Sequence, residues 1–213
     1  MPVLTEPACD VFQEIKRLPT GLLVSRAAVG VEHFDRRVFD LSEEQLDQAF
    51  LPDAGPGVGT WPIRALLAHL ADEEVAITHR VRRTLAEEGP MLAAFDENAF
   101  IDAGLHAGKG YAFATPDHHP ALPIGGAVAV IYTLRRWNAD LWSRLSPEQW
   151  ERRAMHPEWG ELTVRGMVGF VTWHLEHHAR FLNRKIERFL GPIPDQPPAA
   201  AGCGPNCACA GKR

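Results

Sequence analysis

Four long segments of the chain place apolar residues every three or four positions, which is the spacing of helices that bury one face. They run from about Thr20 to Phe39, from Thr60 to about Glu88, from about Gly125 to Leu145 and from Thr163 to Leu190. No series of alternating apolar and polar positions competes with them as a set of strands. The pattern therefore predicts an all-α fold.

Side chains that cap helix N-termini stand where several of the predicted helices begin. They are Ser42 with Gln45 and Ser146 with Gln149, both in capping-box order, Thr60 ahead of Pro62, and Thr163. The capping boxes open two short helices, the first of which is predicted to end near Phe50, whereas Thr60 and Thr163 cap long helices. Segments 51–59 and 156–160, which hold Gly and Pro, are predicted to be a loop and a turn.

A long connection separates the second long helix from the third. Residues 89–124 are rich in Gly and Pro and contain three histidines, among them His106, and this length favours a long crossover. Four amphipathic helices with long crossovers predict a four-helix bundle over residues 1–190, whose core is a usual place for a site built from facing helices. Residues 191–213 hold too little apolar bulk to pack and are predicted to form a separate tail.

Histidines interrupt the apolar stripe of the last helix. His174 and His178 lie beside Val171 and Leu175, and their spacing of four residues puts them within about 40° of each other around the helix axis. Two imidazoles with this spacing can converge on one metal ion. His177 lies three residues after His174 and competes with His178 for that role, so the spacing leaves the choice open.

A histidine also interrupts the buried face of the second predicted helix. His69 lies on a buried face with Leu66 and Leu70, so histidines from two helices can form a set of three that leaves a divalent ion an open position for water or substrate. Asp72 and Glu73 follow on or beside that face, where either is a candidate to orient a ligand or accept a proton. Simpler interpretations stand beside these, because core histidines are often hydrogen-bonded structural residues and helix carboxylates often face solvent.

Composition and charge narrow the class of partner. The chain has 213 residues, 46% of them hydrophobic, and a formal net charge of −5, which fits one ordinary globular domain. An acidic balance without a long Lys/Arg run argues against nucleic acid and against an anionic membrane surface. No apolar run is long enough to span a bilayer and the N-terminus lacks a signal-peptide pattern, so we expect a soluble, cytoplasmic protein that binds a small molecule.

The cysteines are gathered at one end of the chain. Cys203, Cys207 and Cys209 lie in the tail and Cys9 stands alone, which is unlike the disulfide framework of a secreted protein. Clustered thiols can capture a soft ion such as Zn²⁺ or Cu(I), so a non-catalytic metal-binding or redox-responsive protein is one alternative. An incidental, disordered tail is another, and a third is a tail thiolate that reaches the histidine site.

Six short motifs follow one another in order along the chain. They are Gly59-Thr60-Trp61-Pro62-Ile63-Arg64, His69-Leu70-Ala71-Asp72, Phe95-Asp96-Glu97-Asn98-Ala99-Phe100, Arg136-Trp137, His156-Pro157-Glu158-Trp159-Gly160 and Trp173-His174-Leu175-Glu176-His177-His178. Together they resemble the DinB/YfiT-like superfamily over roughly residues 15 to 190. The resemblance implies a four-helix bundle, commonly dimeric, that holds a divalent ion such as zinc or nickel on three histidines. Carried over by position, these ligands are His69, His174 and His178, which selects His178 over His177.

The resemblance also implies an activity. Characterised members of that superfamily use the metal to help a low-molecular-weight thiol attack an electrophile, and a divalent ion can activate either a thiol or a water molecule. The implied function is therefore thiol transfer to a small molecule, with metal-dependent hydrolysis as the alternative. Glu73 and Asp72 are the candidate catalytic residues, and Asp96 and Glu97 would close the pocket from the crossover. The chain departs from the family pattern at Arg135, where relatives often have histidine, and in its cysteine tail.

Overall fold

The computed structural model describes residues 10–51, 55, 58–106 and 123–193. Its helices are α1 (Asp10–Arg17), α2 (Thr20–Ala28), α3 (Glu43–Asp47), α4 (Ile63–Ala86), α5 (Glu97–Asp102), α6 (Ile124–Trp142), α7 (Pro147–Trp150) and α8 (Val164–Leu190). Two 3-10 helices, η1 (Gly30–His33) and η2 (Arg36–Asp40), follow α2, and a hairpin of β1 (Arg153–His156) and β2 (Gly160–Thr163) precedes α8. The helical fold class that the sequence pattern predicts is confirmed.

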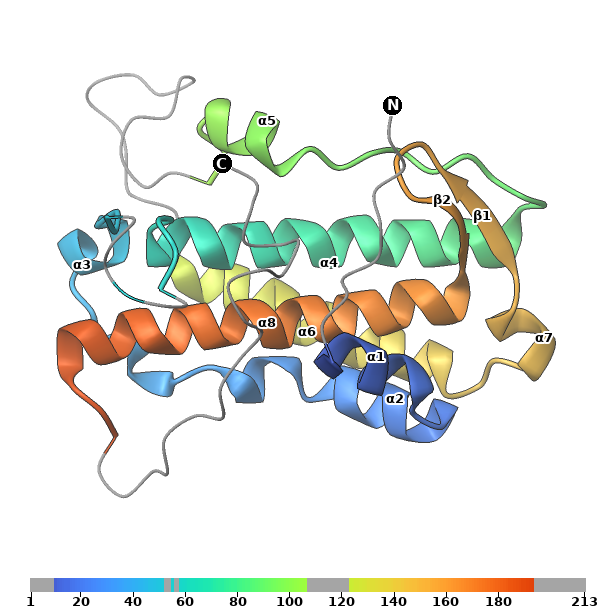
Figure 1. The fold of residues 1–213 in the computed structure, drawn as a ribbon, viewed down its shortest axis with the longest axis horizontal. Coiled ribbons are helices and arrows are strands. Elements are labelled where there is room, and N and C mark those ends of the chain that lie inside the picture. The colour runs from blue at the N-terminus through green and yellow to red at the C-terminus, as the bar shows by residue number, and fades with distance from the viewer. Residues whose placement is uncertain (1–9, 52–54, 56–57, 107–122, 194–213) are drawn as a thin grey trace.

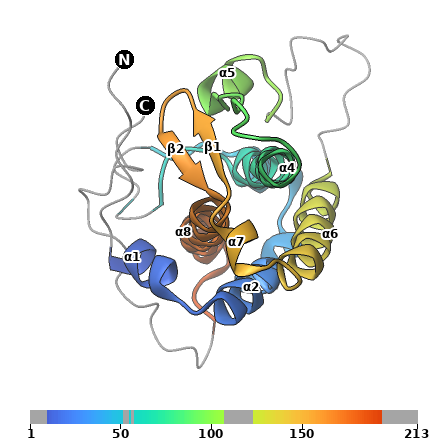
Figure 2. The same ribbon diagram turned by 90° about the vertical axis from the view of Figure 1, so that its right-hand side faces the viewer.

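The bundle consists of α2, α4, α6 and α8. Figure 1 shows α4 and α8 side by side along the long axis of the molecule, where they pack against each other. α6 also packs against α4, and α2 packs against both α6 and α8, which closes the ring of four helices. In Figure 2 the α5 segment and the β1–β2 hairpin lie on the opposite side of the bundle from α2. The predicted four-helix bundle is therefore confirmed.

Two apolar clusters fill the bundle, and a polar layer separates them. One cluster gathers side chains from α1, α2, the hairpin and adjoining parts of α4, α6 and α8, and the other gathers η2, α3 and the remaining parts of these three helices. Between the clusters lie Glu74 on α4, Arg135 on α6 and His174 on α8. Polar groups at this depth need partners, so the middle of the bundle is where chemistry is expected.

The first predicted helix is wrong in its length. It ends at Ala28 rather than at Phe39, and the two 3-10 helices follow. Within the segment that replaces the predicted helix, the backbone N–H of Asp35 donates to Asn183 Oδ1 of α8, and the Asp35 carboxylate accepts from the backbone N–H of Arg37. These bonds compete with a continued helix, as short polar side chains often do.

The predicted cap of the second helix is also wrong. α4 is preceded by Pro62, which makes no side-chain capping bond, and the carbonyl of Thr60 instead accepts from the backbone N–H of Phe50. The same bond explains why α3 ends at Asp47 before it reaches Phe50. The two ends of the predicted 51–59 loop are therefore tied together ahead of α4.

Three parts of the fold were not predicted: α1, the β1–β2 hairpin, and α5, which lies within the predicted crossover. The helix α1 precedes the first predicted segment, and the antiparallel hairpin pairs Arg153 with Thr163 and His156 with Gly160. The predicted 156–160 turn is the tip of this hairpin, where Gly160 has φ of +73°. Strands of this length are too short to show a periodic pattern, so only their turn was visible in the sequence.

The remaining boundary signals are confirmed. Both predicted capping boxes form, at α3 and at α7, and the hydroxyl of Thr163 accepts from the backbone N–H of Gly166 at the start of α8. No helix in the part of the chain that the structure describes is long and apolar enough to cross a membrane. The cysteine tail, and the last part of the predicted crossover, lie outside the described residues.

Candidate metal centre

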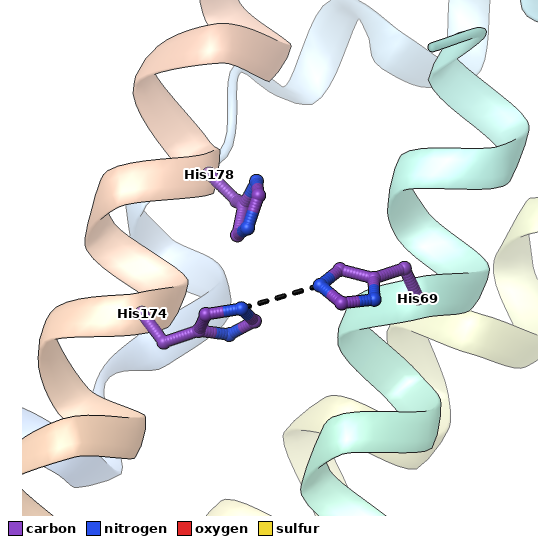
Figure 3. A group of neighbouring side chains, drawn as sticks. All are labelled: His69, His174 and His178. Atoms are coloured by element: carbon purple, nitrogen blue, oxygen red, sulfur yellow. Dashed lines mark hydrogen bonds between the residues drawn. The ribbon is translucent and has the colours of Figure 1, made fainter. Parts of the chain in front are cut away.

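Three histidines meet between α4 and α8. His69 projects from α4, and His174 and His178 project from successive turns of α8 toward it (Figure 3). One ring nitrogen from each lies within 4.8 Å of the others, and Nε2 of His69 is 3.2 Å from Nε2 of His174. Two nitrogens bound to one tetrahedral zinc ion are about 3.3 Å apart, given Zn–N bonds of about 2.0–2.1 Å. These three residues, which we call the histidine triad, thus offer three nitrogen donors grouped about one point, and the His69–His174 pair has the spacing that such an ion requires.

The protonation state of the triad also suits a cation. The pKa of His69 is lowered to about 4, mainly by burial and in smaller part by the nearby His106, while Asp72 opposes the shift. Burial likewise lowers the pKa values of His174 and His178 well below 6.5, with a smaller contribution from the neighbouring imidazoles. The three rings are therefore neutral near pH 7, which is the form that binds a metal.

His177 is not part of this converging group, although its ring lies 5.2 Å from that of His178. Its ring stacks on Trp173 at a centroid distance of 5.1 Å and lies 4.9 Å from the ring of Phe181. It is 5% exposed, and burial lowers its pKa to about 4. The structure therefore brings His178, rather than His177, together with His69 and His174, and His177 is an ordinary buried histidine packed among aromatic rings.

Asp72 lies beside the triad and holds a further histidine. The ring of His106 lies 6.0 Å from that of His69, and its Nε2–H donates to Oδ2 of Asp72 at 2.8 Å. His106 is 2% exposed although it comes from the crossover after α5. The sequence contained no periodic signal for this residue, because connections carry none; a histidine within a long crossover was the only available hint.

Glu73 points to different neighbours. Its Oε1 is 3.8 Å from Arg80 Nη1, and the side chain is almost fully buried. Burial raises the pKa of Glu73 to about 7, an effect that Arg80 opposes and the charges of Glu74 and Glu97 reinforce. Of the two predicted carboxylates, Asp72 is the one whose charge acts on His69, and Glu73 lies on the Arg80 side of α4.

The predicted carboxylates of the crossover also have local roles. The Asp96 carboxylate accepts from the backbone N–H groups of Asn98 and Ala99 and so caps α5. Glu97 stands in the first turn of α5, and its charge raises the pKa of Glu73. Neither contact joins them to the histidine triad.

Aromatic side chains surround the triad. The ring of Trp61 lies 5.1 Å from His69 and 6.3 Å from His178, and it is nearly parallel to His178, with an interplanar angle of 6°. Further rings are Phe95 at 6.1 Å from His69, Phe170 at 5.5 Å and Trp173 at 6.4 Å from His174, and Phe181 at 6.1 Å from His178. The centre is thus three neutral imidazoles in a largely apolar, aromatic setting, with the Asp72–His106 pair on one side.

Known proteins with related sequences are similar over most of this chain. A protein of Oceanobacillus iheyensis named "Putative metal-dependent hydrolase OB0782" is 27% identical over 151 residues, which cover 71% of this chain and 76% of that protein. A protein of Bacillus mycoides with the same kind of name is 26% identical over 187 residues, which cover 87% of this chain and 89% of the relative.

The fold has a solved counterpart, and a family model matches the chain. The structure of YfiT from Bacillus subtilis, described as a "probable metal-dependent hydrolase with an unusual four-helix bundle topology", superposes with a TM-score of 0.65 and 21% identity, covering 82% of this chain and 89% of YfiT. At this identity the likeness concerns the fold. The model of the DinB superfamily matches residues 32–182, from η1 to the last turns of α8. The chain therefore belongs to the DinB superfamily.

Proposed function

We propose that this protein is an enzyme that holds a divalent metal ion on His69, His174 and His178 and activates a nucleophile for attack on a small molecule. The observation that carries the proposal is the convergence of three neutral imidazoles within 4.8 Å in the middle of the bundle. The names of the relatives as metal-dependent hydrolases support it. Imidazole nitrogens suit zinc and nickel, which are the ions we propose.

The triad and the two neighbouring carboxylates have different roles in this proposal. The triad would hold the ion, and an ion bound there would supply the Lewis acidity that makes a water or a thiol a nucleophile near neutral pH. Asp72, anchored by His106, is placed to accept or orient a proton beside His69. Glu73 is the second candidate for that role, since its pKa of about 7 lets it exchange a proton near neutrality.

Two nucleophiles, water and a small thiol, are candidates for the proposed reaction. Water makes the enzyme a hydrolase, which is what the names of its relatives support. A low-molecular-weight thiol makes it a transferase, and the aromatic rings of Trp61 and Phe170 beside the triad favour this second candidate because sulfur packs well against aromatic faces. Both reactions use the same three ligands.

Elemental analysis of the purified protein tests the ligand assignment. His178→Ala is expected to lose the bound metal, whereas His177→Ala, which alters the adjacent buried histidine outside the triad, is expected to keep it. Equal metal content in the two variants would exclude the proposed site. The pair forms a matched comparison because both changes remove one imidazole from the same turn of α8.

Steady-state assays separate the two reactions. The metal-loaded protein is offered esters and amides in water, and in parallel a panel of small thiols with an electrophile. Turnover that requires the thiol identifies the transferase, and turnover in its absence identifies the hydrolase. In either case activity is expected to disappear on chelation and to return when zinc or nickel is added, and activity that survives chelation would contradict a metal-dependent mechanism.

A further inference from the structure

The aromatic rings around the triad differ from those of the core. Trp142 and Trp150, which belong to an apolar cluster away from the triad, are 4% exposed or less. Trp61 and Phe95, in contrast, are only half-buried, although their rings lie within 6.1 Å of His69. A large ring that remains partly exposed beside a candidate metal centre is typical of a ligand-binding surface.

These two rings come from separate segments. Trp61 stands just before α4, and Phe95 stands just before α5, which brings the crossover over His69. The ring of Trp61 is edge-on to His69, with an interplanar angle of 74°, and that of Phe95 is tilted by 22° from the plane of His69. The two side chains therefore meet the same ligand histidine with differently oriented rings. A flat group held against either ring would lie close to the ion.

The charged groups near the triad are already engaged. Apart from histidines, the side chains whose charges shift the pKa values of the triad are Asp72, Arg135 and Lys185. Their partners are His106 for Asp72 at 2.8 Å, Glu74 for Arg135 at 2.6 Å and the carbonyl of Gly59 for Lys185 at 2.9 Å. Recognition of a carboxylate or phosphate needs cationic donors that are free to bind it, so the described surroundings of the triad favour an uncharged ligand.

We propose that Trp61 and Phe95 form the specificity surface of this centre and select a substrate that carries an aromatic or similarly flat apolar group next to its reactive group. The inference rests on the proposed function, since the reactive group is the one that meets the metal. Ring pairs at these distances each contribute about 0.5–1.5 kcal/mol beyond burial of their area. Added to the area that the ring buries, this corresponds to a preference of about tenfold or more for an aromatic ligand over its methyl analogue.

Two hydroxamates of different size provide the test without an assay of activity. Benzohydroxamate and acetohydroxamate present the same chelating group and differ by a phenyl ring in place of a methyl group. Their dissociation constants are measured on the full chain loaded with Co²⁺, through the visible absorption of the ion, and the ratio is divided by that for a small tris-imidazole cobalt complex. The corrected ratio is expected to favour benzohydroxamate about tenfold or more.

Variants test whether Trp61 and Phe95 cause the preference for benzohydroxamate. Trp61→Ala and Phe95→Leu are each expected to reduce the ratio by about threefold or more while the affinity for acetohydroxamate stays within about twofold. Trp137→Ala is the matched control, because Trp137 is a half-exposed tryptophan of α6 whose ring lies over Arg82 at 3.6 Å. Stoichiometric Co²⁺ binding shows that each variant has folded around an intact triad.

The outcomes separate this inference from the proposed function. Equal affinity for the two hydroxamates, or a ratio unchanged in both Trp61→Ala and Phe95→Leu, would overturn the aromatic specificity surface while leaving the metal centre in place. A wild-type chain that binds no Co²⁺ would overturn the proposed function and, with it, the inference. A ratio that falls equally in Trp137→Ala would also overturn it, since the effect would not be local to the triad.

Discussion

Two buried polar groups occupy the middle of this bundle, and they differ in how their charges are balanced. On one side of α4, Arg135 and Glu74 form an ion pair in which both side chains are 2% exposed. The Arg135 guanidinium donates to Glu74 Oε1 and also to the backbone carbonyls of Ala27 and Val171. One side chain of α6 thus binds α2, α4 and α8, and all of its partners lie within the protein. We call Arg135 and Glu74 the structural group.

The histidine triad also lies in the middle of the bundle, but no oppositely charged partner in the described part of the chain faces it as Glu74 faces Arg135. Three neutral bases converge, and the described residues supply a single hydrogen bond among them, between His69 and His174. The other ring nitrogen of His69, Nδ1, is buried without a hydrogen-bond partner among those residues. Glu74 Oε2 likewise has no hydrogen-bond partner among the described residues, but there the two charges of the ion pair balance each other. Three uncharged bases that converge without such a counterpart support the proposal that a cation completes the triad. Arg135 therefore belongs to the structural group and not to the triad.

Acid is the perturbation expected to have the largest effect, and it acts on the buried histidines. The pKa of His69 and that of His177 are about 4 in the folded chain, against about 6.5 in an unfolded one. The unfolded state therefore binds more protons below pH 6.5, and each residue contributes about 3 kcal/mol of stability that is complete above pH 6.5 and is lost as the pH falls toward 4. Urea unfolding of the metal-free protein between pH 7.5 and 4.5 measures this loss.

A matched pair of variants locates the effect. His69→Gln is expected to remove one residue's share of the dependence of stability on pH and to leave the share of His177. His79→Gln, which changes an exposed histidine of the same helix, is the control. Stability that stays constant from pH 6.5 to 4 in the wild type would contradict the burial of neutral imidazoles.

Removing Arg135 should break the structural group without touching the triad. Arg135→Met leaves Glu74 buried without its counter-ion, and we expect a loss of about 3–5 kcal/mol in the free energy of unfolding. The double variant with Glu74→Leu removes the stranded carboxylate and is expected to recover part of the loss. Urea titrations of the three proteins measure both effects, and a single variant as stable as the wild type would show that the ion pair is dispensable.

Metal binding at the triad should stabilise the folded chain. Zinc at a free concentration of about 100 times its dissociation constant is expected to raise the free energy of unfolding by about 2.7 kcal/mol, because the ion binds the folded chain alone. His174→Ala removes a ligand and is expected to abolish this increment, whereas His177→Ala keeps it. Unfolding with and without zinc gives the increment for each protein, and an increment that persists in His174→Ala would place the ion elsewhere.

The two groups also differ in how far the sequence could predict them. His69, His174 and His178 were visible because each interrupts an apolar stripe of a long helix, and periodicity is a local property. The choice between His177 and His178 needed the family resemblance, since the side-chain directions on one helix turn are too close. His106 could not be found this way, because it reaches the triad through a connection whose path no local pattern describes.

The structural group was hidden for a different reason. Arg135 and Glu74 are ordinary charged residues of amphipathic helices, and their pairing joins positions that are 61 residues apart. The 3-10 segment after Ala28 belongs to the same class, because the backbone N–H of Asp35 within it donates to Asn183 of α8. Long-range partners decide these features, so they become visible only when the helices are packed.

Gly30 tests how tightly the structural group is packed, and its effect is expected to be the smallest. A Cβ atom added at Gly30 would lie 2.3 Å from Cδ of Arg135, so an alanine there must displace the guanidinium from the carbonyls and the carboxylate that it binds. We expect Gly30→Ala to cost about 1–3 kcal/mol, as overpacking of a close-packed core does. Gly21→Ala is the control in α2, where an added Cβ meets nothing within 4 Å and better helix propensity should stabilise the chain by about 0.5–1 kcal/mol. Opposite signs for the two alanines in urea unfolding would locate the penalty at Arg135, and zinc binding that survives Gly30→Ala would show that the two polar groups of the bundle are independent.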